Sequence, residues 1–183
     1  MRVISGLYRG RVLKSPPDNK TRPTSDRLRE TLFNVLAPRI DDETRFLDLC
    51  AGTGAIGIEA VSRGAAFVTF VDRSKRSCAL IEENLDKLDV PESSTEIIGI
   101  DADNFTGREH KLGWDIAFYD PPYDSDYSLV LHEFGYNKTL LNDSGILVVE
   151  HHTKKTVPDE VGSLRRWRVI KQGETSLSFY ERS

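Results

Sequence analysis

The sequence predicts a doubly wound α/β domain, and three observations support this class. Strand-length apolar runs alternate with helical patterns from Arg45 onward, which is typical of parallel βαβ units with right-handed crossovers. The first run leads into a glycine-rich turn, Ala51-Gly52-Thr53-Gly54. Near the C-terminus, strand patterns at 167–171 and 177–181 follow each other around Gly173 with no helical pattern between them. They predict an antiparallel hairpin at one edge of the sheet.

The charge of the chain is unevenly distributed. The 183 residues carry a net charge of −4, yet residues 1–39 hold nine Lys and Arg against three Asp and Glu. We therefore expect a basic N-terminal extension, residues 1–39, that packs on a main domain of residues 40–183. An acidic protein is a poor general nucleic-acid binder, so any phosphate-facing surface is expected on this extension. The alternative is that these charges are only a solvated face.

The extension is predicted to contain a β-hairpin and a helix. Segments 2–5 and 11–14 have strand patterns with glycines between them, and both carry basic side chains. Thr24-Ser25-Asp26 offers N-caps to a helix whose apolar stripe runs from Leu28 to Leu36. Pro38 is expected to end that helix.

The main domain is predicted to alternate strands and helices up to the C-terminal hairpin. Helical spacing of apolar residues indicates helices over 55–63 and, after a Ser74 cap, to Leu88. The strands expected before the hairpin are 45–49, 67–71, 96–100, 115–119 and 145–150.

Several classes of protein are disfavoured by the sequence. No apolar run reaches the roughly 18 residues that a membrane span needs, and the first residues lack the apolar core of a secretory signal. Cys50 and Cys78 are the only cysteines, and no paired metal-ligand spacing occurs; His151-His152 is expected to be solvated. We therefore expect a reduced, metal-free, cytoplasmic domain without a disulfide framework, and a monomer.

The glycine-rich turn predicts a nucleotide-type cofactor site. Glycines after a strand let the backbone approach a ligand closely, beside the first amides of the next helix. Asp72 follows the next predicted strand and can accept hydrogen bonds from ribose hydroxyls. The spacing Gly52-x-Gly54-x-x-Gly57 also fits NAD. Asp48 favours S-adenosylmethionine instead, because a carboxylate suits the cationic amino group of a methionine better than a pyrophosphate.

A second motif, Asp120-Pro121-Pro122-Tyr123, directly follows the predicted strand 115–119. The nitrogen of an exocyclic base amine is a poor nucleophile because its lone pair is delocalised into the ring. Asp120 and the carbonyl of Pro121 can accept its N–H hydrogens and aim the lone pair at a methyl group, while the prolines hold that carbonyl in a fixed direction. Tyr123 offers a face on which a flipped base can stack. The motif therefore predicts methyl transfer to a base amine.

A weaker signal is Asp101-Ala102, which follows the third predicted strand. An acid at that place can accept a hydrogen bond from the adenine amino group of the cofactor. A loop carboxylate without a ligand is the alternative.

Seen together, these motifs and the N-terminal stretches resemble one protein family. The stretches that carry the resemblance are 2–6, 9–11, 22–34, 47–54, 120–123 and 173–180, so it extends over essentially the whole chain. The chain resembles class I S-adenosylmethionine methyltransferases of the amino-methylating group. In particular, it resembles the bacterial 16S ribosomal RNA guanine-N2 methyltransferases of the RsmD type.

The resemblance implies a Rossmann-like class I methyltransferase fold, with a seven-stranded, mostly parallel sheet whose last hairpin is antiparallel. It implies S-adenosylmethionine as cofactor and 16S rRNA of the assembling small ribosomal subunit as partner, with methylation at the guanine numbered 966. The implied RNA-binding residues are Arg2, Arg9, Arg11, Arg22 and Arg27. The implied cofactor-binding residues are Thr24, Asp48, Ala51, Gly52, Thr53, Gly54, Asp72, Arg73, Asp101, Ala102 and Asp120. Cys50 departs from the pattern, because many methyltransferases have a glycine there.

Three alternative functions remain open on the sequence. A DNA adenine-N6 or cytosine-N4 methyltransferase could use Asp120 in the same way, but such enzymes usually carry a separate target-recognition region. A protein glutamine methyltransferase typically has Asn at this position. A non-catalytic RNA-binding or assembly protein would not bind S-adenosylmethionine.

Overall fold

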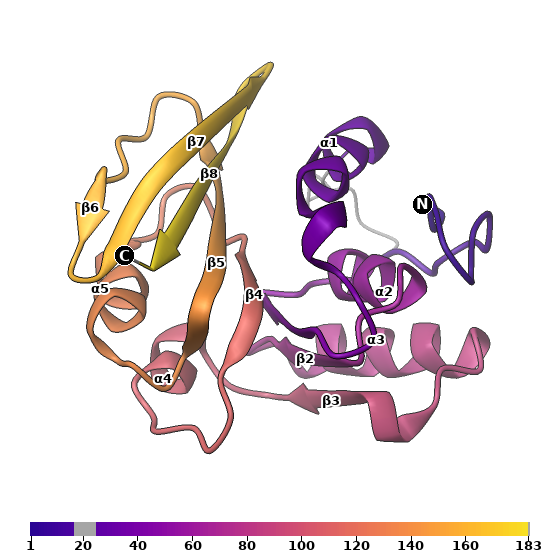
Figure 1. Cartoon of the computed structure of the whole chain (residues 1–183). Helices are drawn as coiled ribbons and strands as arrows, with labels where there is room; N and C mark the ends of the chain where they lie inside the picture. Colours follow the sequence, from indigo (N-terminus) through magenta and orange to yellow (C-terminus); the bar gives the residue numbers. More distant parts are fainter. Residues whose placement is uncertain (17–24, 183) are drawn as a thin grey trace.

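The computed structural model describes residues 1–16 and 25–182, which form one mixed sheet with helices on both faces (Figure 1). The order of its eight strands is β3-β2-β1-β4-β5-β8-β7-β6. The pairs from β3 to β5 are parallel, whereas β8 pairs antiparallel with β5 and β7 antiparallel with β8. The predicted doubly wound α/β class, with an antiparallel C-terminal hairpin, is confirmed.

The observed elements lie close to the predicted ones. The helices are α1 (Asp26–Leu36), η1 (Ala37–Arg39), α2 (Ala55–Ser62), α3 (Lys75–Lys87), η2 (Glu92–Ser94), α4 (Ala102–Thr106) and α5 (Ser128–Tyr136). The strands are β1 (Arg45–Leu49), β2 (Phe67–Val71), β3 (Thr95–Ile98), β4 (Trp114–Tyr119), β5 (Leu141–His152), β6 (Glu160–Val161), β7 (Leu164–Gln172) and β8 (Thr175–Arg182).

The two faces of the sheet are covered by different helices. Alternate residues of a strand point to opposite faces, so Phe118 joins one hydrophobic core and Ala117 the other. The first core also contains the apolar stripe of α1 and side chains of α2 and α3, such as Leu32 and Ile58. The second contains α4 and α5 residues, such as Phe134. Strands buried on both faces explain why the sequence shows continuous apolar runs there.

Three predictions about elements need correction. The sheet has eight strands rather than seven, because the two-residue β6 pairs with β7. The expected N-terminal β-hairpin is reduced to one isolated antiparallel bridge, Arg2 with Val12. His151 is buried rather than solvated, with its Nε2 2.9 Å from the hydroxyl of Ser178.

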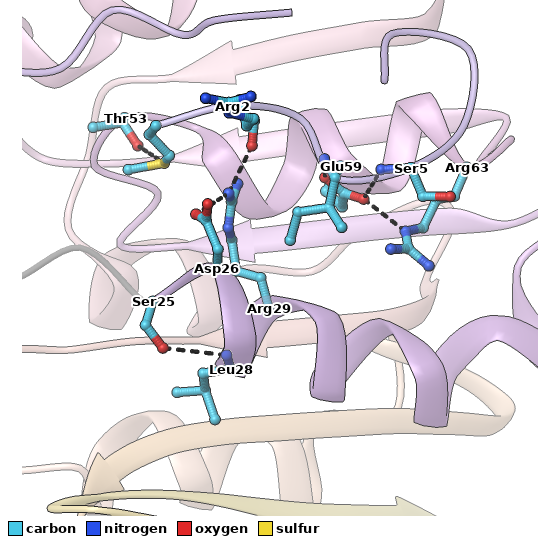
Figure 2. Close-up of polar contacts among 11 residues, drawn as sticks. Arg2, Ser5, Ser25, Asp26, Leu28, Arg29, Thr53, Glu59 and Arg63 are labelled. Carbon is cyan, nitrogen blue, oxygen red and sulfur yellow. Dashed lines mark hydrogen bonds and ion pairs between the residues drawn. The ribbon is translucent and has the colours of Figure 1, made fainter. Parts of the chain in front are cut away.

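The N-terminal segment is held on α2 by buried polar groups rather than by strand pairing (Figure 2). The backbone N–H groups of Ile4 and Ser5 donate to the carboxylate of Glu59, at 2.8 and 3.0 Å, and that carboxylate also pairs with Arg63. Gly6 lies so close to α2 that an added Cβ would be 1.7 Å from the Ser62 carbonyl oxygen. This contact explains the glycine and the absence of a regular hairpin.

Helix α1 is tied to the same segment by Arg29. Its side chain is fully buried, and the guanidinium donates to the Arg2 carbonyl at 2.7 Å and to Asp26 at 2.8 Å (Figure 2). Ser25 caps the helix by accepting a hydrogen bond from the Leu28 N–H, as the sequence predicts. The first turn of α1 is thereby fixed to the first residues of the chain.

Within residues 1–16 and 25–182, no helix is long and apolar enough to span a lipid bilayer. The same residues contain no group of three or more His, Cys, Asp or Glu that could hold a metal ion. Cys50 and Cys78 are both free thiols.

Candidate functional site

A cleft of about 750 Å³ opens where the strands of the parallel part of the sheet end. Ligands of open α/β sheets bind at this edge, and the size is in the range of small-molecule sites. The predicted site residues that line it are Asp48, Ala51, Gly52, Thr53, Asp72, Arg73, Asp101, Ala102, Asp120, Pro121, Pro122 and Tyr123. Gly54 lies beneath the cleft as the N-cap of α2, and Thr24 lies outside the described residues.

The glycine-rich turn passes through three left-handed backbone conformations. Its φ values are 62° at Cys50, 56° at Gly52 and 75° at Gly54. The conformation at Cys50 is one that favours glycine, so it accounts for the glycine that many methyltransferases carry there. Gly57 has a different role, because a Cβ there would lie 2.3 Å from the Phe70 ring, so it allows α2 to pack closely on β2.

Asp72 connects this turn to α3. One carboxylate oxygen accepts from the Gly52 N–H and the other from the Ser74 N–H, both at 2.8 Å. Because each carboxylate oxygen has two lone pairs, both can still accept a hydrogen bond from a ligand in the cleft. The predicted ribose-binding role fits this geometry.

Asp48 is buried beneath the turn. Its carboxylate accepts a hydrogen bond from the Gly57 N–H at 2.9 Å, and burial raises its pKa to about 8. A cation bound next to it would favour the ionised form. The site is therefore suited to a ligand ammonium group, such as the one in the methionine part of S-adenosylmethionine.

Arg73 and Asp101 flank the mouth of the cleft. Their side chains form a long ion pair at 3.8 Å, and both are mostly exposed. Asp101 is also the residue immediately before α4. Asp48, Asp72 and Asp101 together provide acceptors for the amino, ribose and adenine groups of S-adenosylmethionine, so the residues present fit this cofactor.

Asp120 begins the second half of the site, directly after β4. Its N–H donates to the Leu49 carbonyl at 3.3 Å, which places the Asp120–Tyr123 turn beside the glycine-rich turn. The pKa of Asp120 is well above the ordinary value, first because of burial and then because of the charges of Glu150 and Asp48. A carboxyl group with a raised pKa can take up a proton near neutral pH.

Tyr123 is oriented by residues of the adjacent strands. Its hydroxyl lies 3.0 Å from the Thr175 hydroxyl, its ring meets His152 edge-on at 5.5 Å, and Lys155 donates to its carbonyl at 3.1 Å. The side chain remains 38% exposed. The side chain can thus contact a ligand in the cleft that it lines together with Asp120.

Glu150 is a site residue that the sequence analysis missed. It lies near the end of β5, lines the cleft and is 5% exposed. The signal was present, because Glu150 is an acid at the end of an apolar strand, as Asp72 and Asp120 are. In the sequence it is marked only as the last residue of the predicted strand 145–150, without a motif around it.

The predicted RNA-binding arginines fall into different environments. Arg2, Arg9 and Arg27 line one shallow hollow of about 390 Å³, and all three are exposed. Arg11 lies apart, because its guanidinium donates to the Lys87 carbonyl of α3 at 3.0 Å. Arg22 lies outside the described residues.

Comparison with known proteins gives concordant matches over the full length. The family model described as conserved hypothetical protein 95 matches residues 1–181. YlbH of Bacillus subtilis (strain 168) is 34% identical, covering 100% of this chain and 99% of the relative. Ribosomal RNA small subunit methyltransferase D of Escherichia coli (strain K12) is 32% identical, covering 100% and 90%. The solved structure of yhhF from Escherichia coli is 30% identical with a TM-score of 0.88, covering 100% and 98%.

Proposed function

The chain belongs to the family described as conserved hypothetical protein 95, the RsmD family, and we propose that it methylates 16S ribosomal RNA. The proposed reaction transfers a methyl group from S-adenosylmethionine to the exocyclic N2 amine of a guanine. The proposed substrate is the RNA of the assembling small ribosomal subunit, which also implies a cytoplasmic enzyme. The chain is proposed to act as a monomer without a metal ion.

One observation carries the proposal, namely that a single cleft joins the Asp48–Asp72 ligand site to the Asp120–Tyr123 turn. The hydrogen bond from Asp120 to Leu49 links the end of β4 to the end of β1, so a donor and an acceptor bound in the two halves would meet. Such positioning is a large part of what an enzyme contributes to methyl transfer. When bound, S-adenosylmethionine supplies an electrophilic methyl group on a sulfonium.

The residues of the chain have separate roles in this reaction. Asp48 and Asp72 hold the amino and ribose groups of the cofactor. Asp120 and the Pro121 carbonyl accept the two N–H groups of the base amine, so that its lone pair points toward the methyl group. As the new C–N bond forms, the bond between the methyl group and the sulfonium sulfur breaks and the nitrogen loses a proton. The ionised form of Asp120 can accept this proton, because its raised pKa makes the carboxylate a stronger base. Tyr123 stacks on the base, a contact worth about 1–3 kcal/mol.

The test is to incubate the protein with labelled S-adenosylmethionine and small ribosomal subunits that lack the modification. The methylated nucleoside is then identified by mass spectrometry. N2-methylguanosine is the expected product. A different methylated base would contradict the guanine assignment, whereas no product on ribosomal particles, naked RNA or DNA would contradict the enzymatic proposal itself.

A further inference from the structure

Three acidic residues occupy one face of three neighbouring strands at the edge of the cleft. Asp48 lies on β1, Asp120 directly follows β4, and Glu150 lies on β5. The register pairs Tyr119 with Val149, so Asp120 and Glu150 follow at equivalent positions. Their side chains share the face of Phe118 and Val148, two residues earlier, and face the core that contains α1.

Asp120 and Glu150 are therefore neighbours across adjacent strands, which lie about 4.8 Å apart. Both line the cleft together with Pro121 and Tyr123. The charge of Glu150 is the largest electrostatic influence on Asp120 after burial, in agreement with this proximity. A base held on Tyr123 with its amine at Asp120 can turn one neighbouring ring atom toward β5, where Glu150 lines the cleft.

The chemistry of that adjacent ring atom separates the bases. In guanine, the amine N2 lies between N1–H, which is a hydrogen-bond donor, and N3, which is an acceptor, so a base whose N1 side faces β5 presents a donor there. In adenine and cytosine, the amine lies next to a ring nitrogen without hydrogen, which is an acceptor. An ionised carboxylate only accepts hydrogen bonds. It therefore attracts the N1–H of guanine and repels the ring nitrogen of adenine or cytosine.

We propose that Glu150 is a specificity-determining residue, which accepts the N1–H of the target guanine while Asp120 holds the N2 amine. The inference rests on the proposed function, and it adds the reason why this cleft takes guanine rather than adenine or cytosine. A carboxylate has about four lone-pair positions, so Glu150 can accept the N1–H and keep other contacts at the same time.

The experiment compares two target bases that share the reacting amine. Small-subunit particles are assembled on 16S RNA in which the methylated position carries either guanine or 2-aminopurine, which has the same N2 amine but no N1–H. The wild-type protein is expected to methylate guanine at least about 100-fold faster. Glu150→Gln is expected to lower turnover of guanine about 10- to 100-fold. The same substitution should also reduce the preference for guanine over 2-aminopurine below about tenfold, because the amide N–H can donate to N1 of 2-aminopurine.

The ratio of the two rates is measured within one protein, so a partial folding defect cancels from it. Glu150→Asp keeps a carboxylate and should keep the preference, whereas Glu160→Gln removes an exposed acid on β6 and should change neither rate. If Glu150→Gln retains the wild-type ratio, or lowers both rates equally, the inference is overturned while the proposed function stands. If the wild-type protein makes no N2-methylguanosine, the proposed function fails and the inference fails with it.

Discussion

The two halves of the cleft hold their carboxylates in different ways. In the cofactor half, Asp48 and Asp72 accept hydrogen bonds from backbone N–H groups of the glycine-rich turn, α2 and α3. In the half proposed to bind the target base, Asp120 and Glu150 lie on adjacent strands, β4 and β5, and the charge of Glu150 disfavours the ionised form of Asp120. Backbone amides fix an acceptor before the ligand arrives. The electrostatic repulsion between two neighbouring carboxylates is offset only when a partner with several N–H donors binds both of them.

The largest expected effect comes from breaking the target half. Asp120→Ala removes the acceptor of the amine proton, so the rate of methyl transfer should fall about 10²- to 10⁴-fold. Binding of S-adenosylmethionine should weaken only a few-fold, because the cofactor half is intact. Single-turnover kinetics and calorimetry measure the two quantities. Asp124→Ala, an exposed acid of the same loop, is the control; unchanged turnover in Asp120→Ala would remove Asp120 from the mechanism.

The pH dependence of stability tests the environment of Asp48 in the half of the cleft that is proposed to bind the cofactor. Its folded-state pKa of about 8 lies above its ordinary value of 3.8, so the folded protein binds the proton more tightly than the unfolded chain. The stability from this group is complete below about pH 4 and is lost as the pH rises through 8. We expect the free energy of unfolding of the ligand-free protein to fall by as much as about 6 kcal/mol over that window, relative to Asp48→Asn. Chemical denaturation at several pH values measures this difference.

The same residue predicts proton release on cofactor binding. A ligand ammonium next to Asp48 favours its ionised form, so binding at pH 7 should release up to one proton. Calorimetry in buffers of different ionisation enthalpy counts that proton. An equal count in Asp48→Asn would show that Asp48 does not meet the ammonium group.

A smaller effect is expected from the packing that fixes the cofactor half. Gly57→Ala places a methyl group against the Phe70 ring, where a Cβ would be only 2.3 Å away. Overpacking of this kind should lower the free energy of unfolding by about 1–3 kcal/mol, measured by urea denaturation. Gly99→Ala, whose Cβ has no neighbour closer than 3.7 Å, is the matched control. Equal stability of the two variants would contradict the close packing of α2 on β2.

The smallest effects are expected outside the cleft, in the arginines of the extension. Alanine at Arg2, Arg9 or Arg27 should weaken RNA binding about 3- to 10-fold each and flatten its salt dependence, because each phosphate contact releases counterions. Arg11→Ala is the comparison, since that guanidinium is bound to the Lys87 carbonyl and should affect RNA binding less. Filter binding at several salt concentrations measures both. If all four variants behave alike, the shared hollow does not define the RNA surface.

Local signals in the sequence predicted most elements of the fold. Ser25 and Ser74 cap the helices that they precede, and Gly52 and Gly54 adopt the left-handed conformations that the turn requires. The helices α4 and α5 were not predicted, because α4 has only five residues and the nine-residue α5 begins shortly after the Pro-containing turn. The short β6 was missed because two residues are too few to show the alternation of apolar and polar side chains that predicts a strand.

The sequence predicted those residues of the candidate site that lie at the end of a predicted strand or in the glycine-rich turn. Asp48, Asp72 and Asp120 were found because the position of each is marked by a motif in the neighbouring sequence. Glu150 has no such motif, and only the pairing of β5 with β4 brings it beside Asp120. Likewise, the burial of Arg29 and His151 depends on contacts with Arg2 and Ser178, which are distant in the chain.

The sequence by itself determined the order of strands and helices, the glycine-rich turn and the carboxylates that follow particular strands. These features depend on residues within a few positions of one another, where backbone preferences and side-chain caps act directly. The tertiary structure alone decided which strands became neighbours, and therefore which carboxylates lie next to each other in the cleft. It also decided that the extension is docked by the buried Glu59 carboxylate rather than by a hairpin. The physical reason is that burial and electrostatic coupling depend on distance in space, and the packed sheet joins residues that the chain keeps far apart.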